Sequence, residues 1–83
     1  MIKNTLEKYS LLETKVNVLG GKPCLKGTRI SVDMILEWIA SGASIPAIVE
    51  QYPHVTEEAV VQAIRFAAEI VQNDQFIQVK LAS

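Results

Sequence analysis

Apolar and polar positions recur with helical spacing over the second half of the chain. Three apolar segments each begin just after a serine or threonine, residue types that cap the N-termini of helices. The segments and their caps are Val32–Ser41 after Ser31, Ile45–Tyr52 after Ser44, and Glu57–Gln72 after Thr56. The pattern predicts three short helices joined by tight turns, which is typical of a helix-turn-helix bundle.

The first thirty residues have a less regular pattern. Residues 1–14 predict an arm with one short helix capped by Asn4, and Val16–Val18 alternates like a strand that Gly20 ends. Residues 15–30 are therefore expected to form a β-hairpin or loop. The predicted fold is mainly α, a homeodomain-like three-helix bundle over residues 31–72 with an N-terminal β-hairpin arm and a tail at 73–83. A chain of 83 residues is expected to form one domain, because a second core would have little to bury.

The predicted helices carry more apolar surface than one small core can bury. On the last helix, one narrow polar seam stands out, and it consists of Glu58, Gln62, Arg65, Glu69 and Gln72. Apart from Glu57 at its start, everything else on that helix is apolar, which exceeds the stripe of roughly 100° that a surface helix needs. The surplus indicates a partner surface, unless the arm and tail cover it within one chain. The candidate contact residues are Trp38, Ile64, Phe66, Ala67, Ile70 and Phe76, with the tail Phe76–Leu81 adding a strand or clasp.

Charge divides the chain into a basic arm and an acidic remainder. Residues 1–29 hold six lysines and arginines against two glutamates, whereas residues 30–83 hold two against seven carboxylates. Arg29 is expected to pair with Asp33. The basic side chains that could contact an anion or nucleic acid are Lys22, Lys26 and Arg29, although this patch is too small for strong non-specific binding.

The last predicted helix is poorly suited to reading DNA. A recognition helix presents its N-terminal residues to base edges, and here that end carries Glu57 and Glu58. Two carboxylates at that position would be repelled by phosphates, so any nucleic-acid contact is expected from the basic arm instead.

Residues that could support catalysis are few. Gly20–Thr28 resembles a phosphate-binding loop in composition, but its lysine, glycine and threonine are in the wrong order and Pro23 removes a backbone donor. Cys24 and His54 are each the only residue of their type, which is too few for a zinc site, and Cys24 is expected to be a buried small hydrophobe. We expect no enzymatic activity, no metal and no cofactor. No apolar run could span a bilayer and no signal peptide is evident, so we expect a cytoplasmic protein without membrane contact.

Three stretches of the chain resemble the signature of domain-of-unknown-function family 433. They are Leu19–Ile30 (LGGKPCLKGTRI), Ser31–Gly42 and Ile48–Thr56, and the similarity extends over about Val16 to Val71. The resemblance implies a helix-turn-helix fold of the homeodomain kind. It also implies an antitoxin role, because many members resemble antitoxins of two-gene modules whose toxin is similar to a PIN-domain ribonuclease.

These observations favour a non-enzymatic, antitoxin-like protein that forms a dimer and binds a PIN-like ribonuclease toxin. One alternative is a DNA-binding autoregulator that uses the three basic residues of the arm. Another is a homo-oligomeric interaction module with neither activity. The identity of the neighbouring gene product would separate the first hypothesis from the other two.

Overall fold

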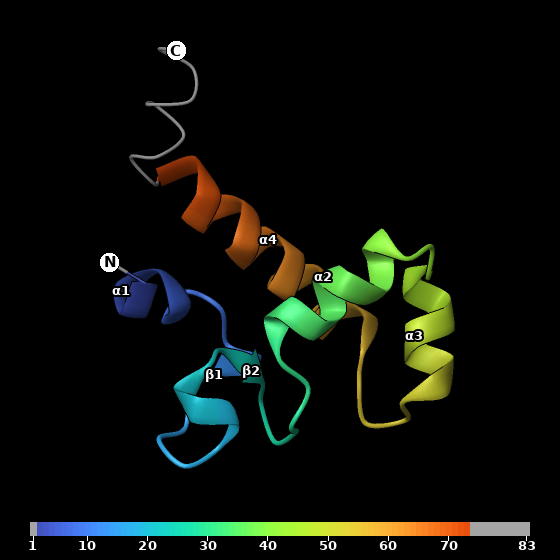
Figure 1. Cartoon of the computed structure of the whole chain (residues 1–83), viewed down its shortest axis with the longest axis horizontal. Helices are drawn as coiled ribbons and strands as arrows, with labels where there is room; N and C mark the ends of the chain where they lie inside the picture. Colours follow the sequence, from blue (N-terminus) through green and yellow to red (C-terminus); the bar gives the residue numbers. More distant parts are fainter. Residues whose placement is uncertain (1, 74–83) are drawn as a thin grey trace.

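The computed structural model describes residues 2–73, which form four α-helices and a small antiparallel sheet (Figure 1). The elements, in chain order, are α1 (Ile2–Leu6), β1 (Leu12–Glu13), the 3-10 turn η1 (Leu19–Gly21), β2 (Cys24–Leu25), α2 (Val32–Ala40), α3 (Ile45–Gln51) and α4 (Glu57–Asn73). The prediction of a mainly helical fold is confirmed. The predicted tail from residue 74 onward, Phe76 included, lies outside the described residues.

The three predicted helix starts are confirmed by their capping hydrogen bonds. The hydroxyl oxygens of Ser31 and Ser44 each accept a bond of 3.2 Å from the backbone N–H three residues on, and the Thr56 hydroxyl accepts one of 3.1 Å in the same way. At its other end, α2 ends at Ala40, two residues before Gly42, whose φ of 105° is one that glycine adopts readily because it has no side chain. Local side-chain chemistry therefore sets the boundaries of these helices.

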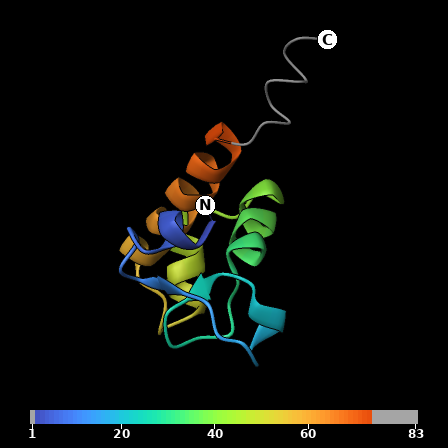
Figure 2. The same cartoon turned by 90° about the vertical axis from the view of Figure 1, so that its left-hand side faces the viewer.

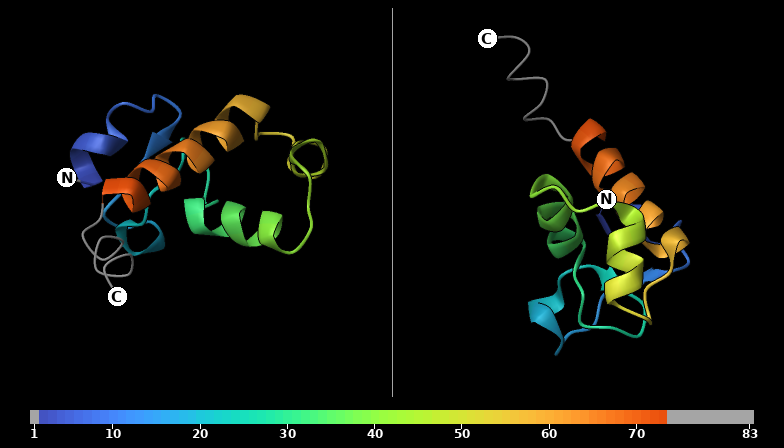
Figure 3. Two further views of the ribbon diagram at one scale, coloured as in Figure 1. Left: turned by 90° about the horizontal axis from the view of Figure 1, so that it is seen from above. Right: turned by 90° about the vertical axis from the view of Figure 1, so that its right-hand side faces the viewer.

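Helix α4 is the element around which the others pack. It contacts α1, α2, α3 and both strands. Seen from above, α1 and α2 lie on opposite sides of α4 (Figure 3, left). The β1–β2 hairpin lies at the end of the molecule away from the C-terminal end of α4 (Figure 2). One long helix is thus covered by an N-terminal arm on one side and by α2 on the other.

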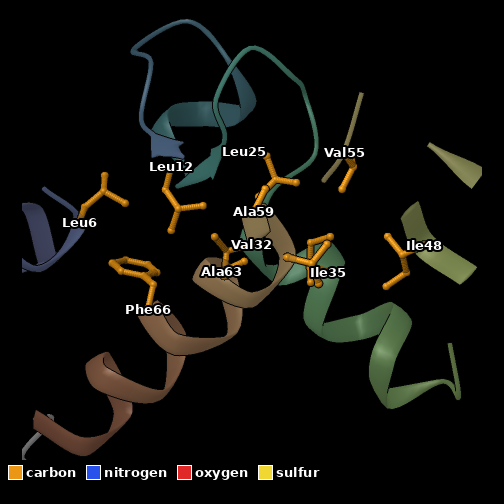
Figure 4. Close-up of a cluster of buried hydrophobic side chains, with 11 residues drawn as sticks. Leu6, Leu12, Leu25, Val32, Ile35, Ile48, Val55, Ala59, Ala63 and Phe66 are labelled. Carbon is orange, nitrogen blue, oxygen red and sulfur yellow. The ribbon is translucent and has the colours of Figure 1, made fainter. Parts of the chain in front are cut away.

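A single cluster of buried apolar side chains joins the arm to the helices (Figure 4). Leu6 from α1 and Leu12 from β1 lie next to Phe66 of α4, so the arm contributes to the core. The cluster consists of Leu6, Leu12, Leu25, Val32, Ile35, Ile48, Val55, Ala59, Val60, Ala63 and Phe66. Burial of these side chains stabilises the fold by roughly 1.5–3 kcal/mol for each large residue.

The position of the first strand differs from the sequence prediction. The strand expected at Val16–Val18 is wrong, because Val16 is 89% exposed in the loop between the strands. The pairing instead joins Leu12 to Leu25 in antiparallel register, and both of these leucines are buried. The register is set by the two apolar side chains that the core can receive, whereas the alternation around Val16 has nothing to pack against.

The short N-terminal helix is also displaced from its predicted start. Asn4 lies inside α1 and not at its N-cap. The prediction that Asn4 caps the helix is therefore wrong. The apolar residue that fixes this helix is Leu6, which is 7% exposed and belongs to the core.

Candidate interaction surfaces

The residues predicted from the sequence to form one contact surface occupy three different places. Ile64 and Ala67 line a groove between α2 and α4, and Trp38 lines a pocket between α2 and α3. Phe66 is only 4% exposed and belongs to the core, so its assignment to an interface is wrong. Ile70 is half-buried and packs against the core. The structure therefore divides the predicted surface and removes one of its members.

Phe66 is buried because the arm packs over it. Its ring meets the ring of Tyr9 edge-on, with centroids 5.9 Å apart and planes inclined at 79°. This arrangement is one that aromatic pairs prefer, because the positive edge of one ring meets the negative face of the other. The alternative that the arm covers part of the apolar surplus thus holds for this side of α4.

Polar contacts fix the arm on the same side of α4. Glu69 accepts hydrogen bonds from Lys8 Nζ at 2.6 Å and from the Tyr9 hydroxyl at 2.7 Å. Gln62 precedes Phe66 by one helical turn, and its Oε1 accepts a hydrogen bond of 2.9 Å from the backbone N–H of Leu11. We call Gln62, Phe66 and Glu69 the arm face of α4. Their spacing of four and then three residues puts them on one side of the helix, where the sequence shows only a polar seam.

The arm contacts also shift the titration of their groups. The hydrogen bond from Lys8, followed by that from Tyr9, lowers the pKa of Glu69. The same bond raises the pKa of Lys8, and the bond to Glu69 raises the pKa of Tyr9. All three shifts favour the arrangement in which Glu69 is ionised while Lys8 and Tyr9 keep their protons.

The groove between α2 and α4 is the main apolar surface that the described residues leave open. It is shallow, with a volume of about 570 Å³. Leu36 on α2 is 37% exposed and Val71 on α4 is 48% exposed. We call it the α2–α4 groove, and its lining consists of Leu36, Ile64, Ala67, Ala68, Val71 and Gln72. No charged side chain is in this lining.

A second hollow is lined by residues from α2 to the end of α3. Helix α3 lies on the side of the molecule away from α1 (Figure 1). The rings of Trp38 and Tyr52 stack there almost in parallel, with centroids 4.8 Å apart and an angle of 4° between planes. We call this hollow of about 290 Å³ the α2–α3 pocket, and its lining consists of Trp38, Ser41, Ala43, Ala47, Ile48, Gln51 and Tyr52.

The basic candidates of the arm are not equally available. Lys22 forms an ion pair of 3.3 Å with Asp33, so Asp33 pairs with Lys22 and the expected pair with Arg29 is wrong. The Ser31 side chain, followed by Lys22, lowers the pKa of Asp33. Lys26 and Arg29 are exposed. The turn after β2 that carries them is held by Glu13, which accepts a bond of 2.8 Å from the Gly27 N–H.

Cys24 and His54, the two residues considered for catalysis or metal binding, differ in burial. Cys24 has no exposed surface, and burial raises the pKa of its thiol, which disfavours the nucleophilic thiolate. The prediction that Cys24 is a buried small hydrophobe is confirmed. His54 is exposed in the turn before α4. Within residues 2–73, no three or more histidine, cysteine or acidic side chains gather as a metal site would need. None of the helices described is long and apolar enough to cross a membrane.

Comparison with known proteins supports the resemblance seen in the sequence. The family model for DUF433, "Protein of unknown function", matches residues 13–67. A crystal structure at 2.00 Å of a DUF433 member protein from Anabaena variabilis ATCC 29413 is similar in fold, with a TM-score of 0.69 and 22% identity over 99% of this chain and 78% of that one. No curated protein sequence matches the chain. Because the family model covers more than half of its residues, this chain belongs to the DUF433 family.

Proposed function

We propose that this protein is a non-enzymatic, antitoxin-like protein that self-associates and binds a PIN-like ribonuclease toxin, with α2, α3 and α4 arranged as in a homeodomain. The observation that carries the proposal is the α2–α4 groove, which is apolar, open and free of charged lining. Contiguous apolar surface of this kind marks protein interaction sites. The antitoxin role itself rests on the family resemblance.

The lining of the groove suits a helix or strand of another polypeptide. Ala67 and Ala68 contribute small side chains to its lining, so a partner backbone can approach closely. Leu36 and Val71 supply larger apolar side chains for the partner to cover. Because no charge must be stripped of water, binding there gains from apolar burial without a large desolvation cost.

Charges beside the groove support self-association through it. On α4, Arg65 is exposed and precedes Ala68 by one turn, while on α2 the exposed Glu37 follows Leu36. A two-fold axis brings the same surface of two copies together. A pairing that crosses α4 of one copy over α2 of the other brings Arg65 opposite Glu37 on both sides of the axis.

The DNA-binding alternative has less support. Lys22 is engaged with Asp33, and Glu57 and Glu58 are exposed at the start of α4. A small patch of Lys26 and Arg29 remains on the hairpin side. A salt-dependent shift of the protein's own promoter fragment that is lost in Lys26→Glu would favour this alternative over toxin binding.

Coexpression with the product of the neighbouring gene tests the proposal. We expect a stable complex, relief of toxicity, and a dimer of the free protein by sedimentation analysis. Val71→Arg in the groove should abolish association, whereas Val16→Arg should leave it unchanged, because Val16 is an exposed valine remote from the groove in the hairpin loop. A monomer at all concentrations that forms no complex and relieves no toxicity would overturn the proposal.

A further inference from the structure

The α2–α3 pocket has no part in the function proposed above, yet it is shaped to receive something small. Its volume of about 290 Å³ lies at the lower limit of small-ligand sites, which span roughly 300–1,000 Å³. That space admits one large side chain of a partner more readily than a whole metabolite. Ile48 belongs to its lining and is 3% exposed, while Ser41 and Gln51 are exposed and supply polar groups at its lining.

Two aromatic rings form one wall of the pocket. Trp38 and Tyr52 are half-buried and stacked face to face, so each ring covers one face of the other and keeps one outer face. Tryptophan and tyrosine are the aromatic residues that attract cations to their faces, and among protein side chains the planar guanidinium of arginine stacks on them best.

The two helices beside the pocket, α2 and α3, carry acidic residues and no basic ones. Residues 30–56, which include α2 and α3, contain Asp33, Glu37 and Glu50 but no lysine or arginine. Glu37 is exposed and lies one helical turn before Ser41, which is part of the lining. Helix α2 ends at this lining with no basic residue in its last turn, so the negative end of its dipole is not neutralised from within the helix.

We propose that the α2–α3 pocket binds an arginine side chain presented by a partner polypeptide. The guanidinium continues the stack on an outer face of the Trp38–Tyr52 pair, and the Glu37 carboxylate balances its charge. The hydroxyl of Ser41 and the amide oxygen of Gln51 accept its remaining N–H groups. This occupant matches the sign of the surrounding charge, which a phosphate backbone does not. The lining of the pocket shares no residue with the lining of the α2–α4 groove.

Trp38 is the only tryptophan in the chain, so its fluorescence reports directly on the pocket. The probe is N-acetyl-arginine amide, titrated at constant ionic strength beside the lysine and citrulline derivatives. N-acetyl-tryptophan amide serves as the control for collisional quenching. We expect a saturable change with arginine, binding at least about twofold weaker with lysine, and no saturable change with neutral citrulline. Equal responses to arginine and citrulline, or to arginine and lysine, would overturn the proposal.

Variants separate pocket binding from general charge attraction. Tyr52→Leu should weaken arginine binding roughly two- to fivefold, because it removes half of the aromatic wall, while Tyr52→Phe should retain it. Glu37→Gln should weaken binding by about twofold. Glu58→Gln removes the same charge from the exposed start of α4 and should have no effect. If Tyr52→Leu fails to fold by circular dichroism, Glu37→Gln against Glu58→Gln decides, and equal binding by those two variants would overturn the proposal.

Discussion

The arm face of α4 and the side of α4 that lines the α2–α4 groove both carry apolar side chains, but within residues 2–73 only the arm face is covered. On the arm face, Phe66 is buried beneath Tyr9, and Glu69 holds the arm with two hydrogen bonds. On the groove side, Val71 stays 48% exposed although α2 runs alongside. The difference comes from residues sixty positions away in the sequence and not from the composition of the helix.

This comparison shows how a small chain can bury part of its surplus apolar surface and leave the rest exposed. The polar seam that looks like a solvated edge in the sequence supplies Gln62 and Glu69 as anchors for the arm. The groove has no such anchors, since Gln72 is its one polar lining residue. A partner at the groove therefore has to be held mainly by apolar contact.

Truncating the arm face should have the largest effect. Phe66→Ala is expected to lower the free energy of unfolding by roughly 3–5 kcal/mol, because it leaves a cavity under Tyr9 and Leu12. Urea unfolding followed by circular dichroism measures this change. A loss below about 1 kcal/mol would mean that the arm does not pack tightly on α4, and the contrast between the two faces would disappear.

Leu12→Ala tests the same contact from the side of the arm. Leu12 is 5% exposed, so its truncation should cost roughly 2–4 kcal/mol. Far-ultraviolet circular dichroism and Tyr fluorescence should give coincident unfolding transitions, since arm and helices share one core. Two separate transitions would show that the arm is a detachable appendage.

Acid should weaken the arm contact by a smaller amount. The pKa of Glu69 lies below its ordinary value of 4.5, so the stability it contributes is present above that pH and is lost as pH falls through the lowered folded-state pKa. We expect the difference in unfolding midpoint between the native chain and Glu69→Gln to shrink as pH falls below about 4.5.

The carboxylate of Glu13 provides the comparison for that experiment. Its pKa is also lowered, by the hydrogen bond from the Gly27 backbone N–H, but it lies in the hairpin and not on the arm face. Glu13→Gln should therefore leave the Glu69 contribution to the pH profile intact. A profile of Glu69→Gln identical to that of the native chain would contradict the anchoring role of Glu69.

Shortening a groove residue should have the smallest effect on folding. Val71→Ala is expected to change the free energy of unfolding by no more than about 0.5 kcal/mol, because the side chain is half exposed. The same urea titration measures it beside Phe66→Ala. A loss as large as that of Phe66→Ala would show that the groove is structural, and its proposed role as a binding surface would fail.

Local signals made the helices predictable. Serine and threonine caps and the spacing of apolar residues place α2, α3 and α4 within about one residue of their observed ends. The family could also be identified from sequence motifs.

Contacts between residues far apart in the sequence could not be predicted from these local signals. The pairing of Leu12 with Leu25 depends on which side chains the core can receive, so the strand expected at Val16–Val18 was wrong. The burial of Phe66 depends on the arm, which docks from sixty residues away. The stacking of Trp38 on Tyr52 likewise joins α2 to the end of α3. Because the sequence does not show this contact, Trp38 was assigned to the same surface as the residues of α4.

The complete burial of Cys24 makes the rate at which its thiol is labelled a measure of how often the structure opens. It is the only thiol, and it sits in β2 with no surface accessible to solvent. A reagent that captures sulfhydryls must wait until the hairpin separates from the helices, because the raised pKa also keeps the sulfur protonated. The rate of labelling therefore reports the frequency of unfolding. A ligand that stabilises the folded state will lower this rate without contacting the sulfur.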